Sequence, residues 1–194
     1  MNVRIKGFTV LELLIVIGIV AVITSTVFGN YPEFSRRLAI EREAQLVALT
    51  LRDAEERAIR TRRAGGSFFI PFGVHFDLAN PKEYILFADT DFGGNQNFYD
   101  AGEEIETITM GRSVQLKDIC AYEKQGGSPP PDCDINSLSI TFKRPAPLIK
   151  VHGVKGGPVV DMGVPDFEIY VETEDGVHQQ KIVVWTTGAI SIEN

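Results

Sequence analysis

The sequence contains few of the residues and motifs from which catalytic and metal sites are built. Among its 194 residues are only two cysteines, three histidines and one tryptophan. His75, His152 and His178 do not have the spacing of metal ligands. The chain also lacks a Gly-x-Ser-x-Gly nucleophile motif and a phosphate-binding glycine loop. We therefore expect a protein that is not an enzyme, although residues far apart in sequence can also assemble an active site.

Positive charge is scarce as well. The chain has 19 Lys and Arg against 26 Asp and Glu, a net charge of −7. Because nucleic-acid binding depends on clustered Lys and Arg, nucleic acid is not an expected partner. One locally basic stretch contains Lys143, Arg144, Lys150 and Lys155, together with His152. It lacks interleaved aromatic residues, so we interpret it as a solvated loop or a contact to an acidic neighbour, with DNA binding as the alternative.

Charge is nearly absent from residues 8–28, where Glu12 is the only ionisable side chain. As a helix, these residues would be about 31 Å long, which matches the hydrocarbon core of a bilayer. Arg4 and Lys6 precede the run and predict a cytoplasmic amino end. A buried core helix and a cleaved secretory signal are the alternatives. The run is apolar on every face, too long for a signal and not followed by a small-residue cleavage site.

The start of this run contains a specific motif. Residues 6–14, KGFTVLELL, resemble the class III signal of type IV prepilins, in which a short basic leader ends in Gly before a mature chain with Glu at its fifth position. The resemblance implies that prepilin peptidase cuts between Gly7 and Phe8. It also implies that the new amine of Phe8 is methylated.

The spacing from Phe8 to Glu12 has a chemical explanation of its own. An unpaired carboxylate in hydrocarbon is costly, so an acid inside such a run is by default functional. Cleavage after Gly7 would create an ammonium at Phe8, and Glu12 of a neighbouring subunit could neutralise it in the apolar interior. Glu12 is therefore predicted to be a docking and register group for assembly, not a catalyst.

Beyond Pro32, which is expected to kink the helix, the pattern becomes amphipathic. Apolar residues recur at helical spacing up to Ala58, and charged residues fill the intervening positions. Arg60, Arg62 and Arg63 suit the end of a helix, and Gly65-Gly66 would stop it. We interpret the charged face as solvated, with a binding surface as the alternative.

After Gly66 the sequence predicts a β-rich head. Turn residues separate the candidate strands Ser67–Phe76, Glu83–Ala88, Ile105–Met110, Leu138–Phe142, Phe167–Glu172, Val177–Trp185 and Ala189–Ile192. Asp175-Gly176 is a strong hairpin turn. The expected fold class is α+β: a long amino-terminal helix, transmembrane in its first half, packed through its amphipathic half on an antiparallel sheet. Segments 84–91, 100–104, 182–184 and 188–192 resemble minor pseudopilins of the GspH/FimT group.

Cys120 and Cys133 would close a loop of about 14 residues, and a bond between them would stabilise the fold by roughly 3 kcal/mol. Two reduced thiols are the alternative. A metal site is poorly supported, because neither cysteine is part of a Cys-x-x-Cys pair.

Residues 89–100 have a cadence like that of an EF-hand calcium loop, with oxygen donors at Asp89, Asp91, Asn95, Asn97 and Asp100. The match is incomplete, because Gly93 occupies the fifth place and the twelfth is Asp instead of a bidentate Glu. The sequence leaves two interpretations: a polar loop with capped turns, or a weak calcium site. No other cofactor is expected.

These observations predict four segments: a cleaved leader (1–7), a membrane and assembly helix (8–28), its amphipathic continuation (29–65) and the head (66–194). By resemblance, the chain would be a structural minor subunit of a type II secretion pseudopilus or type IV pilus. Its partners would be other pilins or pseudopilins, prepilin peptidase, the inner-membrane assembly platform and membrane lipid. It would cross the bacterial inner membrane once, with its head outside the cytoplasm. A DNA-binding minor pilin and a membrane-anchored extracytoplasmic binding protein are the alternatives.

Overall fold

The computed structural model describes residues 7–60, 70–90, 96–111, 113–122, 132–143 and 148–193. The chain forms two units, residues 1–38 and 39–194. The first helix, α1 (Val10–Ile59), contributes to both units, and its second half belongs to the unit that contains every strand. The helix ends at Ile59, while Gly65-Gly66 and the arginines at 62 and 63 lie outside the described residues.

Within the first unit the helix continues through Pro32. Its axis changes direction between Thr26 and Tyr31, in the turn that precedes the proline. A proline has no N–H to donate, and its ring crowds the carbonyl four residues earlier, so a bend in this turn has a local cause. The sequence predicted a kink here.

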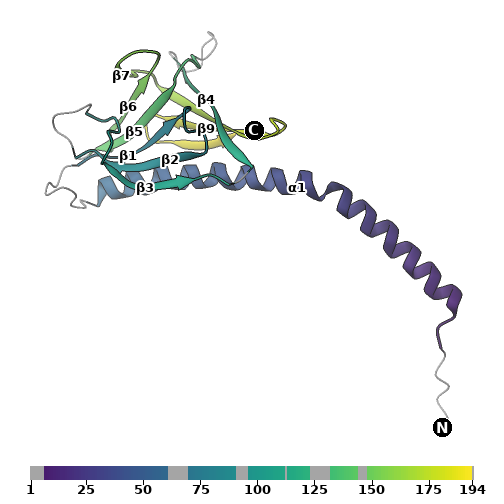
Figure 1. Ribbon diagram of the computed structural model, residues 1–194. Helices are drawn as coiled ribbons and strands as arrows, with labels where there is room; N and C mark the ends of the chain where they lie inside the picture. The colour runs from purple at the N-terminus through teal and green to yellow at the C-terminus, as the bar shows by residue number, and fades with distance from the viewer. Residues whose placement is uncertain are drawn as a thin grey trace. The chain divides into compact units, whose positions relative to one another are not determined.

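The second unit contains two antiparallel sheets (Figure 1). The larger has the order β3-β2-β1-β5-β6-β7 and the smaller the order β10-β9-β8-β4. The strands are β1 (Phe72–Asp77), β2 (Glu83–Ala88), β3 (Glu104–Thr109), β4 (Val114–Tyr122), β5 (Ser137–Lys143), β6 (Leu148–Val154), β7 (Val159–Asp161), β8 (Asp166–Thr173), β9 (Gln179–Trp185) and β10 (Ile190–Glu193).

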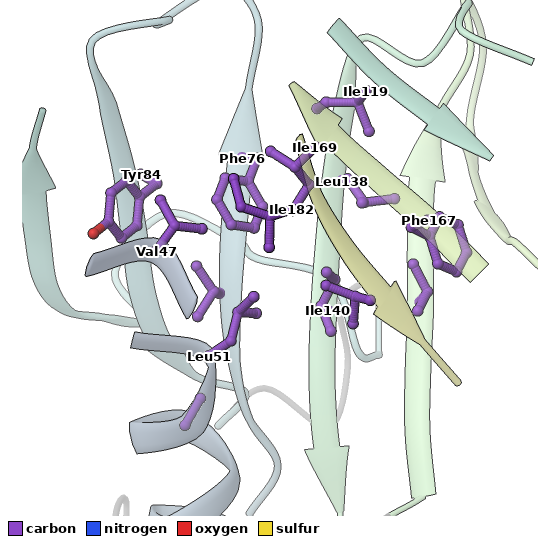
Figure 2. Close-up of a cluster of buried hydrophobic side chains, with 14 of the residues drawn as sticks. Val47, Leu51, Phe76, Tyr84, Ile119, Leu138, Ile140, Phe167, Ile169 and Ile182 are labelled. Carbon is purple, nitrogen blue, oxygen red and sulfur yellow. The ribbon is translucent and has the colours of Figure 1, made fainter. Parts of the chain in front are cut away.

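One hydrophobic core joins the second half of α1 to both sheets. The helix contributes a buried stripe at Ile40, Ala44, Val47, Leu51, Ala54 and Ala58. This 3- and 4-residue spacing places all six side chains on one side of the helix. Figure 2 shows Val47 and Leu51 gathered with Phe76 and Tyr84 of the larger sheet and Ile182 of the smaller one. The second unit therefore has the predicted α+β class, but its strands form two antiparallel sheets where the sequence predicted one.

Each of the seven predicted strands overlaps an observed one, and the Asp175-Gly176 turn joins β8 to β9 as expected. The turn is tight: Gly176 has a φ of 68° and its N–H donates to the carbonyl of Thr173. Strands β4, β6 and β7 were not predicted. The interpretation of residues 143–155 as a loop was wrong for Leu148–Val154, which form strand β6. In this strand Ile149 and Val151 point into the core and alternate with Lys150 and His152, which point to the other face.

Candidate functional sites

The predicted processing site lies immediately before the capped start of α1. Thr9 Oγ1 accepts a hydrogen bond from the backbone N–H of Glu12 at 3.2 Å, which is the first half of a Thr-x-x-Glu capping box. Gly7 and Phe8 precede the helix, and Phe8 is 79% exposed. A Cβ at Gly7 would have no atom within 4 Å. The Gly7–Phe8 peptide bond is thus in open, non-helical backbone, where a peptidase could bind it.

The side chain of Glu12 is exposed and makes no hydrogen bond or ion pair to any described residue. Its carboxylate does not return to Thr9, so the second half of the capping box is not formed. By contrast, Glu33 farther along the helix pairs with Arg37 at 2.9 Å. The backbone N–H of Glu12 thus takes part in the helix cap, while its carboxylate is available to a partner outside this chain.

The helix around Glu12 is apolar and uncovered. Every side chain described from Gly7 to Leu38 is exposed. The large apolar ones are Phe8, Val10, Leu11, Leu13, Leu14, Ile15, Val16, Ile17, Ile19, Val20, Val22, Ile23, Phe28, Tyr31, Phe34 and Leu38. In the part of the chain that the structure covers, no single helix is long and apolar enough to cross a membrane, whereas the bent pair Val10–Thr26 and Tyr31–Ile59 qualifies when taken together.

Cys120 and Cys133 form a disulfide. Cys120, on β4, is buried, and Cys133 is exposed. Beside the bond, the backbones of Ala121 and Asp132 pair in an antiparallel bridge, and Asp132 accepts a hydrogen bond from Lys155. The disulfide therefore fastens both ends of the segment between the two cysteines.

The Asp- and Asn-rich loop is described only in part, because Asp91 and Asn95 lie outside the described residues. Asp89 is buried and its Oδ2 accepts the backbone N–H of Asn97 at 2.8 Å, where Asn97 has a φ of 63°. Glu103, also buried, accepts the N–H groups of Thr90 and Asp100 at 2.8 and 3.1 Å. These carboxylates cap turns. Among the described residues no group of three or more His, Cys, Asp or Glu could hold a metal ion, and the calcium site stays a prediction.

The basic stretch predicted between residues 143 and 155 is not a uniform positive patch. Lys150 Nζ lies 3.7 Å from Asp161 Oδ2, and Lys155 contacts both Asp132 and Asp134. Lys143 is exposed at the end of β5, and Arg144 lies outside the described residues. Acidic partners thus compensate two of the three described lysines.

Sequence reasoning missed a buried polar cluster on the larger sheet. His75 Nδ1 lies 2.8 Å from Ser139 Oγ, and the backbone N–H of Tyr99 donates to the same oxygen at 3.1 Å. Burial lowers the pKa of His75 to about 4, against a smaller opposing effect of Asp77. His75 alternates with the buried Val74 and Phe76, so the sequence indicated a strand but not the partner across it.

Comparison with known proteins adds no assignment. The chain matches no family model, no curated protein and no solved structure.

Proposed function

We propose that the chain is a structural subunit of a type IV pilin-like filament, a minor (pseudo)pilin of a type II secretion pseudopilus or a type IV pilus. In this proposal, prepilin peptidase cleaves after Gly7 and methylates the amine of Phe8. The first half of α1 resides in the bacterial inner membrane until an assembly platform moves it into the filament. The head lies outside the cytoplasm.

The observation that carries the proposal is the exposed apolar helix with one unpaired acid near its start. Burial of each large apolar side chain between Phe8 and Leu38 would contribute about 1.5–3 kcal/mol of favourable free energy. These side chains therefore require lipid or neighbouring helices to cover them. Glu12 is unpaired within the described chain. Burying its unpaired charge in lipid or among apolar helices would be costly. A neighbouring copy that supplies the ammonium of Phe8 provides both a cover and a counter-charge.

The rest of the chain is compatible with this role. The second half of α1 is bound to the head through its buried stripe, so a pull on the helix would be transmitted to the head. The resemblance implies this helix-on-sheet arrangement. The disulfide suits an oxidising compartment outside the cytoplasm. The lysines Lys150 and Lys155 are paired with acids and give no support to a DNA-binding role.

The proposal is tested first by intact mass and amino-terminal sequencing of the full chain, expressed in a bacterium that has prepilin peptidase. The expected product begins at Phe8 and has gained one methyl group. A Gly7→Asp variant should stay uncut while its head is still folded and disulfide-bonded. An uncut wild-type chain, or a cut after the apolar run, would overturn the proposal.

Assembly is tested separately with Glu12→Gln. Gln keeps the size of the side chain and its suitability for the third helical position, so capping and membrane insertion should not change. Recovery in sheared filaments should fall at least tenfold, since the docking charge is lost. Glu41→Gln is the matched control, because Glu41 is exposed on the second half of the same helix. Equal recovery of the two variants would exclude Glu12 as the docking group.

A further inference from the structure

Two histidines flank one serine on the larger sheet. His75 of β1 is opposite Ser139 of β5, and Ser139 is opposite His152 of β6. Residues in register on neighbouring strands share a face of the sheet, so the three side chains lie in one row. The flanking residues Val74 and Phe76 are buried in the main core, which places this histidine row on the other face.

A segment between β2 and β3 packs on the histidine row. The rings of Phe98 and Tyr99 lie 5.1 Å from the ring of His75, and Phe98 meets it edge-on. Ser139 is completely buried, and His75 is 7% exposed. The bond from Tyr99 N–H to Ser139 Oγ fastens this segment, residues 96–103, directly to the row.

The polar contacts are complete only when His75 is neutral. Ser139 Oγ accepts the N–H of Tyr99 and can then donate its own proton to Nδ1 of His75, which gives a continuous chain of donors. If His75 gains a proton, Nδ1 becomes a donor, and the serine hydroxyl loses its acceptor. The cation would also be buried without a direct counter-ion contact.

Other ionisable groups face the row from each surrounding element. Asp77 lies two residues on along β1 and favours the charged form of His75. On β6, burial lowers the pKa of His152, whose Nδ1 has no hydrogen-bond partner, while Asp161 of β7 and Asp89 favour its charged form and Lys150 opposes it.

Two carboxylates hold the segment in place. Asp89 accepts the N–H of Asn97, and Glu103, the last residue of the segment, accepts the N–H of Thr90 outside the segment and that of Asp100 within it. Both carboxylates remain in a variant that lacks only His75, so such a variant separates the histidine from the two carboxylates.

We propose that the histidine row is an acid-sensitive fastening: protonation of His75 releases residues 96–103 from the sheet while the sheet and main core stay folded. This inference does not depend on the proposed function. The fold lowers the pKa of His75 from 6.5 to about 4. The attachment of residues 96–103 to the sheet is therefore at full strength above pH 6.5 and weakens as the pH falls below that value. Between pH 7 and pH 5.5 the opening equilibrium should rise about eightfold.

The test is hydrogen–deuterium exchange of the full chain in detergent micelles at pH 7 and pH 5.5, corrected for intrinsic exchange. Peptides covering residues 96–103 should lose about eightfold in protection, whereas peptides from β5 should not change. His75→Asn, which cannot titrate, should remove the pH dependence, and His178→Asn, at the β8–β9 turn, should keep it. Equal wild-type protection at both pH values, or the same loss in His75→Asn, would overturn the inference.

If His75→Asn does not fold, the wild type alone decides through NMR. The ring protons of His75 and the amide proton of Tyr99 should titrate with one shared midpoint. Independent midpoints would contradict the coupling between protonation and release. Titration of the Tyr99 amide with His152 instead would also contradict it.

Discussion

Arg52 donates from Nη1 to the backbone carbonyl of Gly188 at 3.1 Å, across 136 positions of sequence. The bond ties the second half of α1 to the turn between β9 and β10. Gly188 has a φ of 96°, a conformation that glycine adopts without strain, and its N–H donates to the carbonyl of Trp185. The same Arg52 nitrogen also contacts Glu55 at 2.8 Å. The helix and the last hairpin are therefore joined by a polar contact outside the shared core.

Replacing Arg52 should loosen this junction. In Arg52→Met the carbonyl of Gly188 loses its donor, and the free energy of unfolding should fall by about 1 kcal/mol, a modest value because Arg52 is half exposed. Urea unfolding in micelles measures the change. Arg42→Met, an exposed control on the same helix, should change it by less than about 0.5 kcal/mol. Equal effects would show that the bond contributes nothing.

The two sides of the helix can be compared with one type of substitution. Leu51 is fully buried in the shared core, and Leu49 is 63% exposed. Leu51→Ala should lower the free energy of unfolding by about 2–5 kcal/mol through lost burial and a cavity. Leu49→Ala should cost at most about 0.5 kcal/mol. Comparable losses in chemical unfolding would contradict the packing of the helix on the sheets.

Removing the disulfide should destabilise the head. The double substitution Cys120→Ala and Cys133→Ala releases a loop with a sequence separation of 13 residues, which corresponds to roughly 3 kcal/mol. The urea midpoint should fall to nearly the value of the reduced wild type. A midpoint like that of the oxidised wild type would mean that the bond does not constrain the unfolded chain.

The outer face of the smaller sheet contains a buried acid that a lysine and a tyrosine hydroxyl contact. Glu168 has a side chain only 5% exposed and pairs with Lys181 at 2.8 Å. This bond raises the pKa of Lys181, so the stabilisation is complete below the ordinary lysine value and is lost only at strongly alkaline pH.

Lys181→Met should leave Glu168 buried without its main counter-charge and cost about 2 kcal/mol near neutral pH. The loss should be partly recovered in Lys181→Met combined with Glu168→Gln. Lys117→Met, which removes a more exposed pair 3.7 Å apart, is the control and should cost about 0.5 kcal/mol or less. Thermal unfolding of the three variants measures these differences.

The strand pattern was predictable where alternation was uninterrupted and turns were marked by Gly or Asp, as at Asp175-Gly176. The sequence did not predict β6, because the strand has only a short alternating pattern and follows a segment with basic residues and prolines. It failed for β4 because its register shifts between Leu116 and Asp118, which breaks the regular period of two. The cysteine pairing could be suggested but not decided, since two thiols become a bond only when the fold brings them together.

By itself the sequence determined the long helix, its change from apolar to amphipathic near Pro32, the α+β class and the acid at Glu12, because these depend on local periodicity and on the absence of charge. Only the tertiary structure decided that Ser139 lies between two histidines, that Arg52 reaches Gly188 and that acids compensate Lys150 and Lys155. These contacts join residues of different strands, of loops, or of the helix and a turn. Their existence depends on sheet order and register, which residue spacing along one strand does not specify.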